Sequence, residues 1–120
     1  MKDSLTEKII GCCFRVHTEL GPGFNEKIYQ GALKIVLQDL GLKFEEEKEF
    51  NISFHNKKIG KFRLDLIIEN KVVVEIKAIT GILPKVFEKQ LLGYLKASGI
   101  HIGLLIDFGN DSCQIKRIIY

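Results

Sequence analysis

Three charged side chains interrupt two neighbouring apolar segments of this 120-residue chain. Asp65 breaks the apolar run at residues 63–68, while Glu75 and Lys77 lie two residues apart at the end of the valine-rich run that follows. Side chains two residues apart on a β-strand project from the same face. A buried carboxylate is costly unless it is paired or binds a metal ion. The trio is therefore a candidate active site, and the simpler alternatives are a structural ion pair with Lys77 or a solvated face.

Whether the three side chains meet depends on the loop between the two expected strands. Directly opposed residues of an antiparallel hairpin share a face. A two-residue turn at Glu69-Asn70 would pair Asp65 with Val74 and place Glu75 on the opposite face. A three-residue loop would instead pair Asp65 with Glu75, and asparagine suits it because asparagine tolerates the left-handed conformation. If the trio is functional, we predict the three-residue loop or a bulge that shifts the register equivalently.

A third carboxylate, Glu26, lies on the apolar face of a helix expected over residues 25–40. At 100° per residue it shares that face with Tyr29 and Leu33, so it points in the direction of the core. The alternative is a first-turn glutamate favoured by the helix dipole. Carboxylates gathered at one site repel one another, and a hard divalent cation, Mg²⁺ or Mn²⁺ rather than zinc, removes that repulsion. Such an ion activates water and polarises a phosphate, while Lys77 can orient the water or offset developing charge.

The surrounding pattern predicts elements in the order ααβββαββ, which gives a sheet with helices packed on it. The first helix is expected to open with a capping box of Ser4 and Glu7, and the third helix with Pro84. The nearly continuous apolar run at residues 102–108 predicts a strand buried on both faces, and residues 113–120 are expected to form an edge strand after it. Helices are expected over residues 4–20, 25–40 and 84–98, and strands over residues 43–54, 61–68, 71–77, 102–108 and 113–120.

Composition narrows the class of protein. Hydrophobic residues make up 46% and charged residues 28% of the chain, which indicates a globular domain rather than disorder, and we expect a single domain over residues 1–120. The apolar runs are shorter than the roughly 20 residues of a membrane span, so no membrane partner is expected. The net charge of +3 permits a polyanionic partner without requiring one. Three cysteines, two of them adjacent, form neither a disulfide framework nor a zinc motif and predict a reducing, cytoplasmic location.

Several side chains around the trio are candidates for contact with substrate. Lys61 and Arg63 belong to a basic run that is typical of a solvated face. Beside a metal site, the same run becomes a track for phosphates. His17 has two alternative roles. It is either a core or capping residue, or it donates a hydrogen bond toward Glu26 or a substrate phosphate. Tyr29 and Tyr94 are expected in the core, with hydroxyls that form hydrogen bonds to polar site residues. The candidate substrate-binding residues are Lys61, Arg63, His17, Tyr29 and Tyr94.

Two motifs resemble those of a known family. Asp65, followed after nine residues by Glu75-Ile76-Lys77, resembles the D…ExK signature of the PD-(D/E)XK nuclease superfamily. The segment at residues 21–29 is similar to the GxxExxY motif of a group of small bacterial and archaeal proteins in that superfamily. The similarity continues through residues 90–97 and 103–109 and ends near residues 116–118, so it spans essentially the whole chain.

The resemblance implies a restriction-endonuclease-like α/β (α+β) fold, with a central mixed β-sheet flanked by helices. It implies that Asp65 and Glu75 are metal ligands and that Lys77 is the catalytic lysine. Glu26 would complete the metal site or hold a water, and Gln90 would be a helix residue beside the active site. Together with the residue chemistry, this predicts that Glu26, Asp65, Glu75, Lys77 and Gln90 form the catalytic set.

The predicted function is that of a Mg²⁺- or Mn²⁺-dependent phosphodiesterase, a nuclease that hydrolyses nucleic acid, DNA rather than RNA. The alternative is a nuclease-like module that binds nucleic acid or a protein partner with little or no catalysis. The small chain indicates weak sequence specificity or a protein partner that supplies targeting, and the expected edge strand could pair across a homodimer. One residue departs from the family pattern: Asp107 stands where asparagine is expected, and it is not expected to touch the metal.

Overall fold

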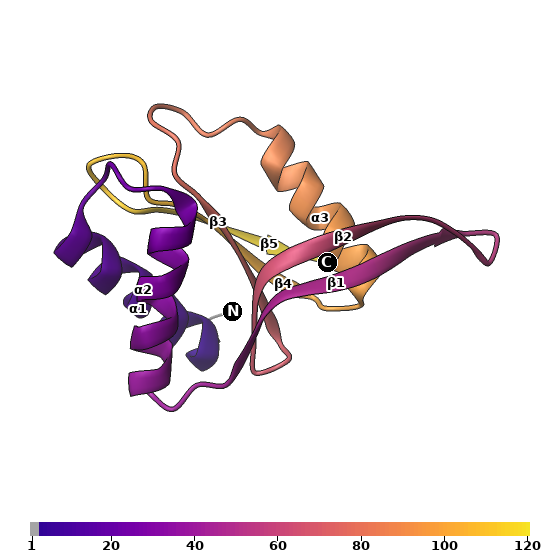
Figure 1. Ribbon diagram of the computed structural model, residues 1–120, viewed down its shortest axis with the longest axis horizontal. Coiled ribbons are helices and arrows are strands. Elements are labelled where there is room, and N and C mark those ends of the chain that lie inside the picture. The colour runs from indigo at the N-terminus through magenta and orange to yellow at the C-terminus, as the bar shows by residue number, and fades with distance from the viewer. Residues whose placement is uncertain (1–2) are drawn as a thin grey trace.

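The computed structural model describes residues 3–120, and its elements follow the predicted order ααβββαββ. Two helices come first, then three strands joined as a meander, and then a helix and two further strands (Figure 1). Within the described residues, no helix is both long and apolar enough to cross a membrane. The helices are α1 (Ser4–Leu20), α2 (Glu26–Asp39) and α3 (Val86–Ser98), and the strands are β1 (Phe44–Phe54), β2 (Lys57–Ile68), β3 (Val72–Lys77), β4 (Ile102–Asp107) and β5 (Gln114–Ile119).

The five strands form one mixed sheet in the order β1-β2-β3-β4-β5. Among the strands of residues 3–120, only β3 and β4 run parallel, and α3 provides the crossover that a parallel connection requires. Residues 103–107 of β4 are all buried, which confirms the prediction of a strand covered on both faces. The edge position of β5 is also confirmed.

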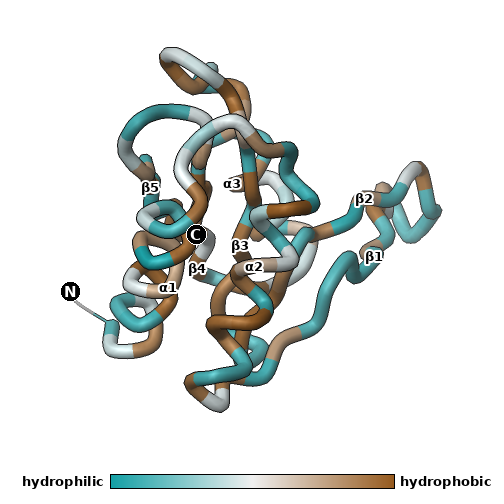
Figure 2. The backbone as a smooth tube through the Cα atoms, turned by 60° about the vertical axis from the view of Figure 1, so that its left-hand side comes forward, coloured by the Kyte–Doolittle hydropathy of each residue, from teal (hydrophilic) through white to brown (hydrophobic). Residues whose placement is uncertain are grey.

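Helices cover both faces of the sheet. Successive side chains of β3 point to opposite faces, toward α1 and α2 on one side and toward α3 on the other. Val72, Val74 and Ile76 pack in the cluster that contains α1 and α2, whereas Val73 packs with α3. Figure 2 shows hydrophobic residues gathered where the helices meet the sheet, and largely hydrophilic residues along the β1–β2 hairpin. Because side chains alternate along a strand, Glu75 falls on the α3 face with Val73.

Two helix starts differ from the prediction. The N-cap of α1 is Asp3, not Ser4, because the Asp3 carboxylate accepts hydrogen bonds from the Leu5 amide at 3.3 Å and from the Thr6 hydroxyl at 2.8 Å. The third helix begins at Val86, two residues after the proline expected to open it. Its N-cap residue makes no side-chain hydrogen bond, so the start of this helix carries no capping signal in the sequence.

The loop between β2 and β3 has the three-residue form that a functional trio requires. Ile68 pairs with Val72 and Leu66 with Val74, which leaves residues 69–71 as the loop. Both Glu69 (φ 54°) and Asn70 (φ 56°) adopt the left-handed conformation. The predicted register is therefore confirmed, although the glutamate shares the left-handed role that was expected of the asparagine.

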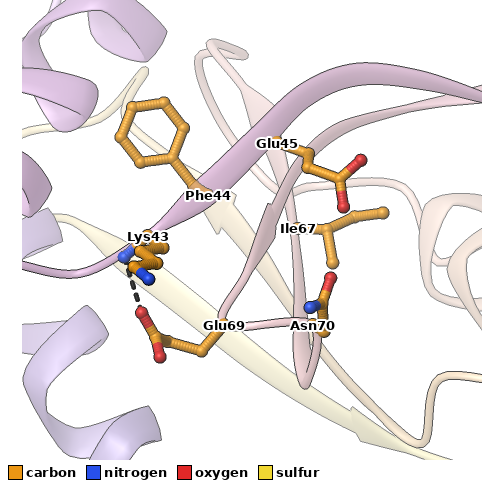
Figure 3. A pocket seen from close by; sticks show the side chains of 6 residues that line it. All are labelled: Lys43, Phe44, Glu45, Ile67, Glu69 and Asn70. Carbon is orange, nitrogen blue, oxygen red and sulfur yellow. Dashed lines mark hydrogen bonds between the residues drawn. The ribbon is translucent and has the colours of Figure 1, made fainter.

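A small hollow of about 100 Å³ lies beside this loop, where β1 begins (Figure 3). The Glu69 carboxylate accepts a hydrogen bond from the Lys43 amide at 2.6 Å across it and so ties the loop to the start of β1. This hydrogen bond anchors the loop between β2 and β3, and none of the candidate catalytic residues lines the hollow. Its lining consists of Lys43, Phe44, Glu45, Ile67, Glu69 and Asn70.

Candidate active site

Asp65 and Glu75 face each other across β2 and β3, where the regular ladder between these strands ends. The Asp65 amide donates to Glu75 Oε1 at 3.0 Å, and the Ile76 amide donates to Asp65 Oδ2 at 2.8 Å. The last regular pair of the ladder is Leu66 with Val74, so side-chain carboxylates replace main-chain carbonyls as acceptors at the next position. Each carboxylate is thus held by the opposite strand, and the two acids are brought together as the register predicts.

The environment of the pair opposes ionisation of both acids. Glu75 is only 8% exposed, and burial, reinforced by the charge of Asp65, raises its pKa to about 8. Burial also raises the pKa of Asp65, although the hydrogen bond from Ile76 and the charge of Lys77 act in the opposite direction. Two adjacent, desolvated carboxylates cannot both ionise cheaply unless a cation joins them. The pair is therefore an acidic site that a nearby positive charge would stabilise.

Lys77 does not supply this positive charge through a direct ion pair with Asp65 or Glu75. Its Nζ atom lies 4.3 Å from the centroid of the Phe87 ring of α3, a cation–π contact. In the described part of the chain, no carboxylate oxygen lies within 4.0 Å of this ammonium, although its charge lowers the pKa values of Asp65 and Glu75. The alternative of a structural ion pair between Lys77 and either acid is therefore not what the structure contains.

Glu26 is exposed, not directed into the core as its helical face predicts, because it is the first residue of α2 and lies ahead of the buried part of the helix. Partial burial nevertheless raises its pKa; the charge of Lys77 lowers it and that of Asp65 raises it. Among residues 3–120, no group of three or more His, Cys, Asp or Glu side chains is arranged to hold a metal ion. The predicted three-carboxylate metal centre is therefore not assembled, and Glu26 lies outside the Asp65–Glu75 pair.

Tyr29 fixes the loop that presents Glu26. Its ring is fully buried and stacks on Phe108 with a centroid distance of 4.6 Å. Its hydroxyl donates to the Gly21 carbonyl at 2.6 Å and accepts from the Phe24 amide at 3.3 Å. A buried tyrosine with both hydroxyl functions used in this way positions a loop, as expected for a core tyrosine, and its contact with substrate stays a prediction.

Replacing Tyr29 with phenylalanine is expected to lower the free energy of unfolding by about 1–2 kcal/mol, because the Gly21 carbonyl loses its donor while the ring packing is kept. Urea denaturation followed by circular dichroism measures the change. The matched control is Tyr120→Phe on a half-exposed ring, for which a change below about 0.5 kcal/mol is expected. Equal stability of the two variants would show that the Tyr29 hydroxyl does not hold the loop.

His17 has a structural environment of the same kind. It is 7% exposed, its Nε2 atom lies 2.8 Å from the Asn110 carbonyl oxygen, and its ring stacks on Phe108. These contacts match the core and capping role, and a contact between His17 and substrate stays a prediction. Tyr94 is different. Its ring stacks on Phe62 at 4.4 Å, and its pKa is raised by burial and by the charges of Glu75 and Asp65, which places it beside the acidic pair.

Three further predicted site residues, like Glu26, lie on the surface. Lys61 and Arg63 are exposed on β2 and pair with glutamates of β1, Lys61 with Glu49 at 3.2 Å and Arg63 with Glu47 at 3.7 Å. Gln90 is exposed on α3, and among the described residues it makes no hydrogen bond to the acidic pair or to the lysine. The contribution of Gln90 to catalysis stays a prediction.

Asp107 has a role that the sequence pattern did not indicate. It is fully buried at the end of β4, and its Oδ1 atom accepts from the Ile79 amide at 2.9 Å and the Gly109 amide at 3.0 Å. A Cβ atom on Gly109 would lie 2.4 Å from the main chain of Ile79, so the two backbones touch. These contacts fix the segment that directly follows Lys77. The signal in the sequence was a carboxylate that closes a fully apolar strand.

A model of the PD-(D/E)XK nuclease superfamily matches residues 3–118 of this chain. A solved structure of a protein called SSO0001 is 21% identical and superposes with a TM-score of 0.61, covering 99% of this chain and 79% of that one, which shows a shared fold. Among curated proteins, none matches. The mixed sheet, its flanking helices and the extent of the family match identify the chain as a member of the PD-(D/E)XK nuclease superfamily.

Proposed function

We propose that this protein is a metal-dependent nuclease of the GxxExxY group that hydrolyses phosphodiester bonds in nucleic acid, DNA rather than RNA. The observation that carries the proposal is the pairing of Asp65 and Glu75 across two strands, buried together beside an ammonium that neutralises neither. A purely structural cluster would be expected to bring Lys77 into contact with one of the acids, since an unpaired buried charge is costly.

The donor set suits a hard divalent ion. One oxygen of each carboxylate is held by a main-chain amide, while Asp65 Oδ1 and Glu75 Oε2 accept no hydrogen bond from residues 3–120. Two carboxylate oxygens from adjacent strands, in a desolvated site where both pKa values are raised, are ligands that Mg²⁺ or Mn²⁺ takes. Asp65 and Glu75 would hold the ion, which agrees with the divalent metals that nucleases of this superfamily generally use.

The chain supplies the remaining chemistry through positioned groups. When bound, a divalent ion polarises a phosphate and lowers the pKa of a water. Lys77, held over Phe87, presents its ammonium to charge that develops on the phosphorus oxygens. Glu26 lies outside the acid pair at the exposed start of α2, where it would hold a water by a hydrogen bond. Tyr94 forms a wall beside the pair and limits its hydration.

Calorimetric titration with Mn²⁺ and with Mg²⁺ tests the metal site, and cleavage of DNA and RNA substrates tests the activity. Wild-type protein is expected to bind the ion and to cleave DNA in its presence, and Asp65→Ala/Glu75→Ala is expected to lose both properties. The matched control is Glu7→Ala/Asp39→Ala, which removes two carboxylates from exposed helical positions and should leave both unchanged. Absence of binding at millimolar metal, even with DNA added, would contradict the proposal and leave a nuclease-like binding module.

A further inference from the structure

The β1–β2 hairpin extends beyond the sheet as a free two-stranded ribbon (Figure 1). β2 starts at Lys57, four residues earlier than predicted, and pairs with β3 only over residues 66–68. Residues 57–64 therefore have β1 as their sole strand partner, a length of roughly 26 Å at the usual rise of a strand. Phe62 and Leu64 pack with α3, so only the end of the ribbon, residues 53–59, lies beyond the core clusters.

A bulge aligns the cations of this ribbon on one face. The register shifts at Ile59, so that Ser53 pairs with Lys58 while Asn51 pairs with Lys61. Opposed residues share a face, and residues 51 and 53 lie two apart, so the bulge brings Lys58 onto the face of Lys61 despite their odd spacing. Arg63 continues the row, but Lys61 and Arg63 pair on this face with Glu49 and Glu47, so Lys58 at the tip is the cation of the row without a glutamate partner among residues 3–120. The opposite face, with Phe50 and Phe62 stacked at 5.5 Å, packs under α3.

The end of the ribbon carries apolar side chains that contribute nothing to the core. Phe54 is 63% exposed and Ile59 is 67% exposed. The intervening turn has left-handed His55 and Asn56, and the Phe54 ring stacks on His55 at 4.3 Å. In the major groove of DNA, apolar side chains of a two-stranded ribbon can contact thymine methyl groups, and neighbouring lysines can contact the phosphates.

We propose that this ribbon grips double-stranded DNA, with the tip at residues 54–59 in the major groove and Lys58 and Lys61 on the adjacent phosphates. The inference rests on the proposed nuclease function and names its substrate class. A two-stranded ribbon fits the roughly 12 Å major groove of B-form DNA, whereas the deep, narrow major groove of A-form RNA excludes it. A second copy of the chain would bring two lysine-bearing tips together, so charge favours a polyanion as the occupant of the tip.

Binding of a labelled DNA duplex of about 25 base pairs, measured by fluorescence anisotropy without divalent metal at several salt concentrations, tests the proposal. Lys58→Gln/Lys61→Gln is expected to weaken binding about 3- to 10-fold and to reduce the slope of log affinity against log salt by about 2. Phe54→Ser/Ile59→Ser is expected to weaken binding about 5- to 10-fold with the slope unchanged. The matched controls, Lys8→Gln on α1 and Ile35→Ser on the exposed side of α2, should bind as wild type does.

The inference is overturned if the ribbon variants bind the duplex as tightly as the controls do, or if they lose affinity equally for single-stranded DNA and duplex RNA. It is also overturned if the Phe54→Ser/Ile59→Ser change alters only the oligomeric state in sedimentation, since a second copy would then occupy the tip. Cleavage separates the two proposals. Ribbon-dependent duplex binding without cleavage in Mg²⁺ would overturn the nuclease proposal alone, and cleavage with ribbon-independent binding would overturn this inference alone.

Discussion

Replacing Glu75 with glutamine is expected to reduce metal-dependent cleavage roughly 1,000-fold or more, and to make the metal-free protein more stable. Cleavage falls because a neutral amide is a poor ligand for a hard cation. Stability rises because burial and the neighbouring Asp65 disfavour the ionised glutamate, while the amide oxygen of glutamine still accepts from the Asp65 amide. A structural ion pair would give the opposite result for stability.

The stability gain is expected to depend on pH in a defined direction. The pKa of Glu75 is raised from 4.5 in the unfolded chain to about 8 in the folded protein, so the folded state binds the proton more tightly. The contribution of Glu75 to folding therefore becomes less favourable as pH rises from about 4.5 to about 8. At pH 7 the glutamine variant should be more stable by on the order of 1–3 kcal/mol, and at pH 4 the two proteins should be nearly equal.

Urea denaturation of metal-free protein across this pH range measures the effect, with Glu7→Gln on the exposed side of α1 as the control. Added Mn²⁺ should then stabilise the wild-type protein by mass action and leave Glu75→Gln unchanged. A variant that is less stable than wild type at pH 7, with a pH dependence like that of the control, would show that Glu75 is a structural partner.

Replacing Gly109 with alanine is expected to lower both stability and activity, although the residue lies outside the acidic pair. The added Cβ would approach the main chain of Ile79 to 2.4 Å, and a backbone contact of that kind cannot be relieved by a side-chain rotation. We expect a loss of about 1–3 kcal/mol in the free energy of unfolding. Because Ile79 is two residues beyond Lys77, the displaced loop should also reduce kcat by about 10- to 100-fold.

The matched control is Gly11→Ala on the exposed side of α1, where a Cβ would meet no atom within 4 Å. Alanine is the better helix former, so this variant should gain about 0.5–1 kcal/mol. Thermal unfolding and steady-state cleavage, measured well below the midpoint of each variant, separate the two effects. Equal kcat for the two variants would show that the loop behind Lys77 does not position the lysine.

The acidic pair could be predicted from the sequence because it depends on local rules. Strand alternation places Glu75 and Lys77 on one face, and the length of the loop at residues 69–71 sets the partner of Asp65. The same rules failed for Glu26, since helical periodicity gives a direction around the axis but not the point along it at which burial begins. The buried part of α2 begins at Tyr29, one turn later.

The contacts behind Lys77 could not be predicted, because they join segments that are distant in sequence. The carboxylate of Asp107 and the bare Cα of Gly109 meet Ile79 only after β4 has paired with β3, and no periodic pattern encodes that approach. The early start of β2 was missed for a different reason. Lys57-Lys58 and Gly60 are typical of a loop, and the bulge at Ile59 breaks the alternation that marks a strand.

The division of the site between neighbouring and distant segments has a consequence for how it assembles during folding. Asp65 and Glu75 belong to one hairpin with a short loop, so their pairing needs only local chain closure, which is fast. The main chain after Lys77 is fixed only when the helical crossover has delivered β4 and its Asp107, a slower, non-local step. The pairing of the two acids therefore depends on a more local step of folding than the placement of the lysine does, so the contacts that attract a cation can form before those that position Lys77.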